Sequence, residues 1–439
     1  MRSLSEAFTA AVVLLIAGVG AAAEAPSPGA IPVRIEGSPA EGFRLLRAGR
    51  PFRIQGVGGH QHLDVLVACG GNTIRTWDVD TLLRETDGVR LIDRAASLGL
   101  AVTVGIWLGH ERHGFDYGDP QQLQQQRQAV TRAVEALRDH PAVLSWGLGN
   151  EMEGPTGSGD SEQIWQEINR LAGLIKSRDR AHPVMTVVAN INPAKVAAIQ
   201  QHAPLVDILG VNAYAGATGV GQQLRQLGWQ KPYCITEYGL PGPWETEQTA
   251  WNAPVEPTSR QKAGMYNAAT REILADPACL GGYAFLWGQK QEATASWFGM
   301  FLPTGEKTIT VDAVTDAWTD RWPDDRAPVL RDVEMPLAGK RLAAGTTLRV
   351  VARSTDPEGE PLSYAWEVRR ESSDRKTGGD AEQSPEVVPG CIVSADDRGV
   401  ATVRLPREPG SYRLFVTVRD GHGSGNIDNW PFQVGSGSR

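Results

Sequence analysis

The sequence has few cysteines and no metal-ligand motif. Only 4 of its 439 residues are cysteine, too few to hold a chain of this length as a disulfide scaffold. No C-x-x-C occurs, and the segment from His110 to His113 is one residue short of the H-E-x-x-H zinc motif. We therefore expect mostly buried free thiols, no metal and no cofactor.

Positive charge is also scarce. Asp and Glu number 51 against 43 Lys and Arg, and a formal net charge of -8 argues against a general nucleic-acid binder. Intrinsic disorder is excluded as well, because 41% of the residues are hydrophobic. Tryptophan, by contrast, is abundant: there are 13 Trp, compared with 8 Tyr and 9 Phe. Tryptophans can serve as platforms for sugar rings, although core packing is the commoner explanation for any one of them.

The first 25 residues predict a secretory signal peptide. Arg2 supplies a basic start, residues 10–19 an apolar stretch, and residues 21–23 small side chains for cleavage. The apolar stretch is short for a membrane span, so we expect a cleaved leader and export to the periplasm or the extracellular space, with an uncleaved anchor as the alternative. We expect no membrane span after cleavage. Nothing in the sequence predicts the oligomeric state.

Between residues 43 and 322, eight short apolar runs alternate with amphipathic stretches. This alternation is typical of parallel strands that are covered by helices on both faces. Eight such units in roughly 280 residues match a TIM (β/α)8 barrel. A doubly wound open sheet is the alternative, but neither a G-x-G-x-x-G nor a Walker motif is present. The predicted strands are 52–57, 72–77, 101–108, 142–148, 184–189, 206–212, 232–236 and 283–287.

The composition changes near residue 322. A polar, proline-flanked linker covers 323–329, and short alternating runs then predict a small all-β, immunoglobulin-like sandwich over 330–439. Within it, the polar segment 371–389 is interpreted as a flexible loop, and Trp366 as a buried core residue. The predicted strands are 347–352, 363–368, 399–405 and 411–418.

Two glutamates directly follow apolar strands: Glu151 after the fourth and Glu237 after the seventh. In a TIM barrel the functional side chains lie at the carboxyl ends of the strands, and strands four and seven lie on opposite sides of the mouth. Such a pair is what glycosidic bond cleavage requires: one acid protonates the leaving oxygen and one carboxylate attacks the anomeric carbon. A structural ion pair, for example with Arg75, explains either glutamate alone but explains the pair less well.

The sequences around these glutamates resemble the motifs of a known enzyme clan. Residues 149–151 (Gly-Asn-Glu) and 236–239 (Thr-Glu-Tyr-Gly) are similar to the acid/base and nucleophile motifs of glycoside hydrolase clan A. The closest resemblance is to the TIM-barrel domain of family 2, with similarity also to family 5 and to β-1,3-glucanosyltransferases. It covers about 43–320. Family 2 usually places β-sandwich domains before the barrel, whereas only residues 26–42 lie between the predicted leader and the barrel. An open cleft with endo action, or transglycosylation, is therefore expected rather than exo-specificity.

The resemblance implies catalytic roles for the matching residues. Glu151 would be the general acid/base and Glu237 the nucleophile of a retaining enzyme, with carboxyl groups about 5–5.5 Å apart. Asn150 would hydrogen-bond the sugar 2-hydroxyl, Arg75 would keep Glu237 ionised and oriented, and Tyr214 would hydrogen-bond Glu237.

Aromatic and histidine side chains are implied as substrate contacts. Trp287 would form the stacking floor of the subsite that holds the cleaved sugar. His110 and Trp77 are weaker candidates. The possible sugar platforms are Trp77, Trp107, Trp244 and Trp297. We expect about half of these four to lie in the core instead.

The C-terminal sandwich resembles PKD, cadherin-like or fibronectin-type modules through residues 355–366. Taken together, the sequence predicts a secreted retaining β-glycoside hydrolase that acts on a β-linked glucan or a related oligo- or polysaccharide. Two alternatives stay open. One is a β-glucanosyltransferase that uses the same carboxylates, and the other is a non-catalytic carbohydrate-binding protein on a barrel scaffold.

Overall fold

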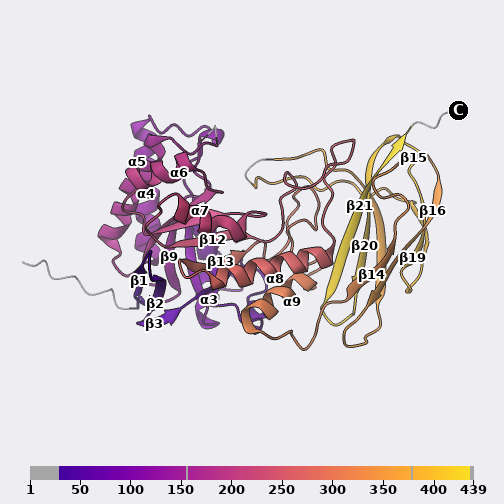
Figure 1. Cartoon of the computed structure of the whole chain (residues 1–439), viewed down its shortest axis with the longest axis horizontal. Helices are drawn as coiled ribbons and strands as arrows, with labels where there is room; N and C mark the ends of the chain where they lie inside the picture. The colour runs from indigo at the N-terminus through magenta and orange to yellow at the C-terminus, as the bar shows by residue number, and fades with distance from the viewer. Residues whose placement is uncertain (1–28, 155–156, 377–378, 436–439) are drawn as a thin grey trace, which may run out of the picture.

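The computed structural model describes residues 29–154, 157–376 and 379–435, and it shows a barrel and a sandwich lying side by side (Figure 1). The predicted signal peptide over 1–25 lies outside the described residues. In the described ranges, no helix has the length and apolar character needed to cross a membrane.

Eight parallel strands close into a barrel, which confirms the predicted TIM-barrel fold. Nearly all residues of these strands are buried, because one face fills the barrel interior and the other packs against helices. In barrel order the strands are β4 (Ile54–Gly58), β5 (Thr73–Arg75), β8 (Ala101–Ile106), β9 (Val143–Leu148), β10 (Val184–Ala189), β11 (Ile208–Asn212), β12 (Tyr233–Tyr238) and β13 (Cys279–Ala284).

The last strand, β13, begins at Cys279, ahead of the predicted start at residue 283. Glycine explains the difference. Gly281 has a φ of 118°, and a Cβ there would lie 2.1 Å from the carbonyl oxygen of Ile54 on β4, so only glycine fits. Because glycine is depleted in strands, residues 279–282 do not carry a strand pattern. All four cysteines of the chain, Cys279 among them, are free and buried, as predicted.

Helices cover the outside of the barrel. The longest, α4 (Pro120–Leu137), begins after Asp119, whose carboxylate accepts from Gln121 N, and it buries Val130 and Val134. The other helices are α1 (Leu63–Ala68), α2 (Val79–Leu83), α3 (Leu91–Ser97), α5 (Glu162–Arg178), α6 (Pro193–His202), α7 (Val220–Gln226), α8 (Ser259–Ala275) and α9 (Ile309–Thr319), with single 3-10 turns η1 (Glu111–His113) and η2 (Ala217–Gly219) and a short ribbon of β6 (Glu85–Thr86) and β7 (Val89–Arg90).

A small antiparallel sheet closes the amino-terminal end of the barrel. It consists of β1 (Val33–Ser38), β2 (Gly42–Arg47) and β3 (Arg50–Phe52). Phe43 and Leu45 of β2 pack in one apolar cluster with residues of the barrel strands. With this end covered, the carboxyl ends of the strands form the accessible mouth.

The C-terminal region forms two four-stranded sheets, which confirms the predicted all-β sandwich. Its core contains Trp366, as predicted, together with Tyr412 and Phe432. One sheet has the order β14 (Val329–Glu334), β16 (Thr347–Thr355), β19 (Val400–Arg404), β18 (Ile392–Ala395), and the other the order β15 (Arg341–Ala343), β21 (Gly425–Gly435), β20 (Gly410–Arg419), β17 (Ser363–Arg370).

Buried polar contacts join the sandwich to the barrel where β21 lies next to α8 (Figure 1). Asn429 Nδ2 donates to Glu256 Oε2 at 2.7 Å, and Asp428 Oδ1 accepts from Ser259 N at 2.6 Å. Burial raises the pKa of Asp428 to about 6. Because these polar groups are removed from water, they stabilise the docked arrangement only as long as they stay paired.

Candidate active site

A cavity of about 860 Å³ lies at the carboxyl ends of the barrel strands. This volume falls within the range of small-molecule sites, roughly 300–1,000 Å³. Five of the predicted site residues line it: Trp77, Asn150, Glu151, Tyr214 and Glu237. The structure thus brings together side chains that the sequence separates by up to 160 positions.

Glu237 is buried at the end of β12 and accepts hydrogen bonds from three side chains. Arg75 Nη1 lies 2.8 Å and Trp77 Nε1 3.1 Å from its Oε1, while Tyr214 Oη lies 2.6 Å from its Oε2. Arg75 Nη2 also donates to Asn150 Oδ1 at 2.6 Å. Burial and the charge of Glu237 hold the pKa of Tyr214 well above its usual value, so its hydroxyl stays a donor. Glu237 is thereby fixed in orientation and balanced by a cation.

Glu151 follows β9 with a φ of 53°, in the left-handed region that non-glycine residues rarely adopt. Its Oε1 accepts from Asn212 Nδ2 at 2.8 Å. Burial, and next the negative charge of Glu237, raise the pKa of Glu151 from 4.5 to about 7. Glu151 is therefore mostly protonated below about pH 7, whereas Glu237 is paired with a guanidinium. Such opposed environments are typical of an acid and a nucleophile.

Asn212 was not among the predicted site residues, yet it joins Glu151 to Asn150, which in turn accepts from Arg75. Its Nδ2 also lies 3.2 Å from Asn150 Oδ1, and its Oδ1 accepts from Thr236 Oγ1 at 2.7 Å. The signal for it was the same as for Glu151: a polar side chain at the end of a buried barrel strand.

Trp287, predicted to be the stacking floor, lies outside the cavity. It is 1% exposed and packs edge-on against Phe301, with ring centroids 5.0 Å apart. Because β13 ends at Ala284, the residues that face the cavity here are Phe285 and Leu286, which are joined by a cis peptide bond.

His110 packs against Trp107, with ring centroids 4.9 Å apart, and is likewise outside the large cavity. Its Nδ1 pairs with Arg112 Nη1 at 3.0 Å. Burial, and then the charge of Arg112, lower the pKa of His110 to about 4, so the imidazole is neutral. It borders a small neighbouring void that Glu151 also lines.

The candidate tryptophan platforms divide between wall and core. Trp107 and Trp244 line the cavity and are 42% and 62% exposed. Trp297, by contrast, is fully buried and donates to the carbonyl of Pro241 at 3.0 Å. Exposed indole faces at a ligand cavity offer an apolar surface on which a ring can stack.

Part of the cavity wall comes from the sandwich, which the sequence did not predict. Arg375, Lys376, Asp380 and Glu382 line the cavity, and all belong to the segment interpreted as a flexible loop. A local sequence pattern carries no information about a contact between residues so far apart in the chain.

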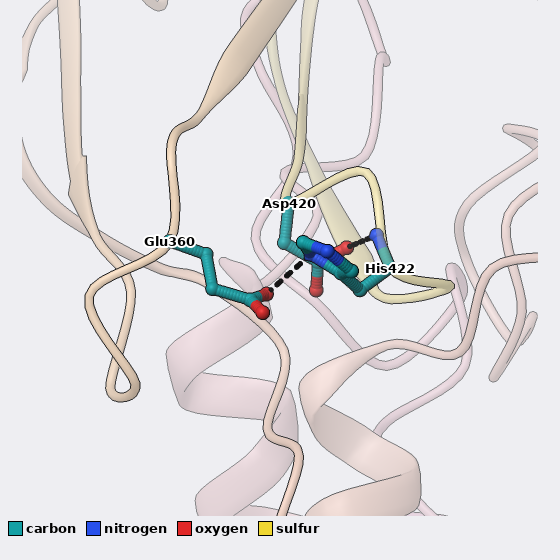
Figure 2. Close-up of side chains that lie close together, drawn as sticks. All are labelled: Glu360, Asp420 and His422. Carbon is teal, nitrogen blue, oxygen red and sulfur yellow. Dashed lines mark hydrogen bonds and ion pairs between the residues drawn. The ribbon is translucent and has the colours of Figure 1, made fainter.

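One cluster in the described part of the chain has the spacing of metal ligands, and it lies in the sandwich (Figure 2). Glu360, Asp420 and His422 each place one potential ligand atom within 4.8 Å of the others. Glu360 Oε2 pairs with His422 Nδ1 at 2.9 Å, and Asp420 Oδ1 accepts from His422 N at 2.7 Å. The cluster joins the loop after β16 to the β20–β21 turn and takes no part in the cavity.

Part of the barrel matches a known protein family. Residues 81–242 match the family model described as the TIM barrel domain of glycosyl hydrolases family 2. The matched segment includes both Glu151 and Glu237. The resemblance inferred from the motifs is thereby confirmed. No curated protein matches the chain.

Solved structures share the fold at low identity. β-Glucuronidase 2 of Bacteroides uniformis, covalently bound to cyclophellitol-6-carboxylate aziridine, is 15% identical with a TM-score of 0.51, over 92% of this chain and 48% of its own. The GH2 β-galacturonidase of Eisenbergiella tayi, bound to galacturonate, is 18% identical with a TM-score of 0.50, over 66% and 54%. The chain therefore spans about half the length of these structures, and the likeness concerns the fold alone.

Proposed function

From the match of residues 81–242 to the TIM barrel domain of glycosyl hydrolases family 2, we propose that this protein is a retaining β-glycoside hydrolase. One observation carries the proposal: Glu151 and Glu237 line the same cavity in opposed environments. The pKa of Glu151 is raised to about 7, and Glu237 is paired with Arg75 at 2.8 Å. Retention follows from the use of one carboxylate as nucleophile and the other as acid/base.

In the first step, Glu151 donates its proton to the glycosidic oxygen, and an oxygen of Glu237 forms a bond to the anomeric carbon as the leaving group departs. Arg75 and Tyr214 hold the attacking carboxylate in place through their hydrogen bonds. Asn150 accepts from Arg75 and Asn212 on Oδ1, so its amide nitrogen is the donor that it offers to a sugar hydroxyl.

In the second step, the ionised Glu151 takes a proton from water as the water oxygen attacks the anomeric carbon, and Glu237 leaves as a carboxylate. Two inversions at the same carbon give net retention. A sugar hydroxyl in place of water would give transglycosylation with the same residues.

For the substrate, we propose an uncharged β-linked glucan or a related polysaccharide. The solved neighbours named above are a glucuronidase and a galacturonidase, and three cationic side chains do line this cavity. Each of them, however, already pairs with a carboxylate of the same chain. The pairs are Lys290–Glu292, Arg375–Glu371 and Lys376–Asp374. A second carboxylate from a uronic acid would have to compete with these partners. We further propose, from residues 1–25, that the protein is exported.

The test is hydrolysis of a panel of 4-nitrophenyl β-glycosides and gluco-oligosaccharides by the wild type and by Glu237→Gln, Glu151→Gln and Glu111→Gln. Loss of the nucleophile should lower kcat/KM by at least about 10²–10⁴-fold for every substrate. Loss of the acid/base should lower it by about 10²–10⁴-fold for gluco-oligosaccharides, and by less for the nitrophenyl glycosides, because nitrophenolate leaves without a proton. Glu111 is the matched control, because it is a carboxylate at the same mouth that does not line the large cavity. Unchanged turnover by Glu237→Gln, or an inverted product by NMR, would contradict the proposal.

A further inference from the structure

The segment that connects β17 to β18 reaches from the sandwich to the mouth of the barrel. We call its described residues, 371–376 and 379–389, the sandwich loop. We propose that the sandwich loop forms a second sugar-binding subsite, next to the one that holds the sugar being cleaved. The inference rests on the proposed function and adds to it: residues outside the barrel would recognise the substrate.

The base of the sandwich loop is fixed by a buried arginine. Arg413 of β20 donates from Nε to Glu371 Oε2 at 3.1 Å and from Nη2 to Glu371 Oε1 at 3.0 Å. The same guanidinium donates to Asn429 Oδ1 at 2.6 Å and to the carbonyl of Pro254, a barrel residue, at 2.9 Å. The loop thus starts from the point where sandwich and barrel are joined.

The tip of the sandwich loop is bonded to two separate barrel loops. Asp380 Oδ2 lies 3.2 Å from His113 Nε2, after β8. On the other side, after β13, Lys290 Nζ donates to the carbonyl of Gly379 at 2.7 Å, and Ala293 N donates to Glu382 Oε2 at 2.7 Å. In barrel order β8 and β13 are separated by β4 and β5. The tip therefore spans the mouth on the side of these two strands.

The loop also has internal bonds that set its shape. Asp374 pairs with Lys376 Nζ at 2.6 Å and accepts from Gln383 N at 2.9 Å, and Glu382 Oε1 accepts from Lys376 N at 3.1 Å. A wall held in this way presents its side chains in a fixed arrangement, which reduces the entropy lost when a ligand binds.

The side chains on this wall suit a polyhydroxylated ligand. Arg375 and Lys376 each have one carboxylate partner that balances their charge, but they carry five and three N–H donors, so donors are left for a ligand. Asp380 and Glu382 supply carboxylate acceptors along the same cavity. A sugar hydroxyl donates and accepts, so it matches such a mixed wall better than a group of a single charge does. The cavity of about 860 Å³ is near the upper end for small-ligand sites, roughly 1,000 Å³, which leaves room beyond the ring being cleaved.

A purely structural loop would make the same anchoring contacts, so the test must separate recognition from stability. The test variant is Arg375→Ala/Lys376→Ala, because both side chains are partly exposed and their ion-pair partners lie in the loop itself. The matched control is Arg398→Ala, which also removes an exposed sandwich arginine from an ion pair, with Asp396 at 2.9 Å, but away from the cavity.

The readout is the ratio of kcat/KM for a tetrasaccharide to kcat/KM for the 4-nitrophenyl β-glycoside of the same sugar. The probes are gluco-tetrasaccharides with β-1,2, β-1,3, β-1,4 and β-1,6 linkages. Loss of two polar contacts should lower the ratio about tenfold, whereas Arg398→Ala should leave the ratio as in the wild type. An unchanged ratio, or an equal fall for both substrates, would overturn the subsite.

Binding distinguishes failure of the subsite from failure of the proposed hydrolase activity. Calorimetric titration of the same four tetrasaccharides into Glu237→Gln protein measures affinity without turnover. When Arg375→Ala and Lys376→Ala are combined with Glu237→Gln, the Kd of the tetrasaccharide that binds should be about tenfold higher than for Glu237→Gln alone. Equal Kd values, or no binding of any of the four, would overturn the subsite. Absence of hydrolysis by the wild type together with this loss of affinity would refute only the enzyme proposal.

Discussion

The raised pKa of Glu151 predicts how activity depends on pH. With a pKa of about 7 instead of 4.5, the carboxyl is about 90% protonated at pH 6, compared with about 3% for an ordinary glutamic acid. A general acid works only in its protonated form. We therefore expect kcat/KM for a gluco-oligosaccharide, whose leaving alcohol needs the proton, to decline about tenfold per pH unit above pH 7.

The causes of this pKa can be tested separately. Burial is the larger cause and the charge of Glu237 is the second. In Glu237→Gln the charge is lost and the burial remains, so the pKa of Glu151 should fall below 7 but stay above 4.5. The measurement is a ¹³C NMR titration of glutamate carboxyls, with Glu151→Gln as the control that assigns the resonance.

Three results would refute this reasoning. A wild-type kcat/KM that stays constant from pH 6 to pH 9 would remove Glu151 from the acid role. A pKa of Glu151 that is unchanged or higher in Glu237→Gln would show that the two carboxyls do not interact, and a value of 4.5 would show that burial contributes nothing.

Further predictions concern stability, orientation, docking and processing. The pKa of Glu151 is higher in the folded than in the unfolded protein, so the wild type loses stability as pH rises from about 4.5 to about 7. Glu151→Gln lacks this titration. Its free energy of unfolding in urea should therefore rise by about 2 kcal/mol relative to the wild type between pH 5 and pH 8. Arg75→Lys keeps the charge but loses the guanidinium fork that reaches both Glu237 and Asn150, so kcat/KM should fall about 10- to 100-fold in steady-state assays. Arg413→Ala removes the buried guanidinium that bonds Glu371, Asn429 and the carbonyl of Pro254, and it should cost about 3–5 kcal/mol in urea unfolding, with an unchanged unfolding free energy contradicting the docking role. Mass spectrometry of the exported protein should find the chain cut between residues 21 and 26, and an intact Met1 would contradict the signal peptide.

The barrel and much of the site were predictable because the barrel topology fixes where the residues at the ends of its strands lie. A polar residue directly after a buried strand can be assigned to the mouth once eight strand–helix units are counted. This rule selected Glu151 and Glu237, and the family resemblance implied roles for Arg75 and Tyr214. The structure places all four in one hydrogen-bonded network. Asn212 also lies at the end of a buried strand, but no catalytic role was implied for it, so it was not predicted.

Trp287 and the sandwich loop were not predictable in this way, for two different reasons. The position of Trp287 depends on where β13 ends. Because Gly281 interrupts the run of apolar residues in β13, the bounds of this strand cannot be predicted from its sequence pattern. The sandwich loop reaches the cavity through contacts such as Asp380 with His113, which are 267 positions apart. Its polar sequence is compatible with a solvated loop, and only the packing of one domain against the other decides its place.

The contact between Trp77 and Glu237 also gives the molecule an internal spectroscopic probe. The indole N–H lies 3.1 Å from the carboxylate that would become esterified to the sugar, and the Arg75 guanidinium lies 5.2 Å from the centre of the indole ring. Indole emission responds to nearby charge. Esterification removes the negative charge from Glu237 while Arg75 keeps its positive charge. Stopped-flow fluorescence of the unlabelled protein can therefore follow the formation and decay of the intermediate in real time, and Trp77→Phe identifies the signal.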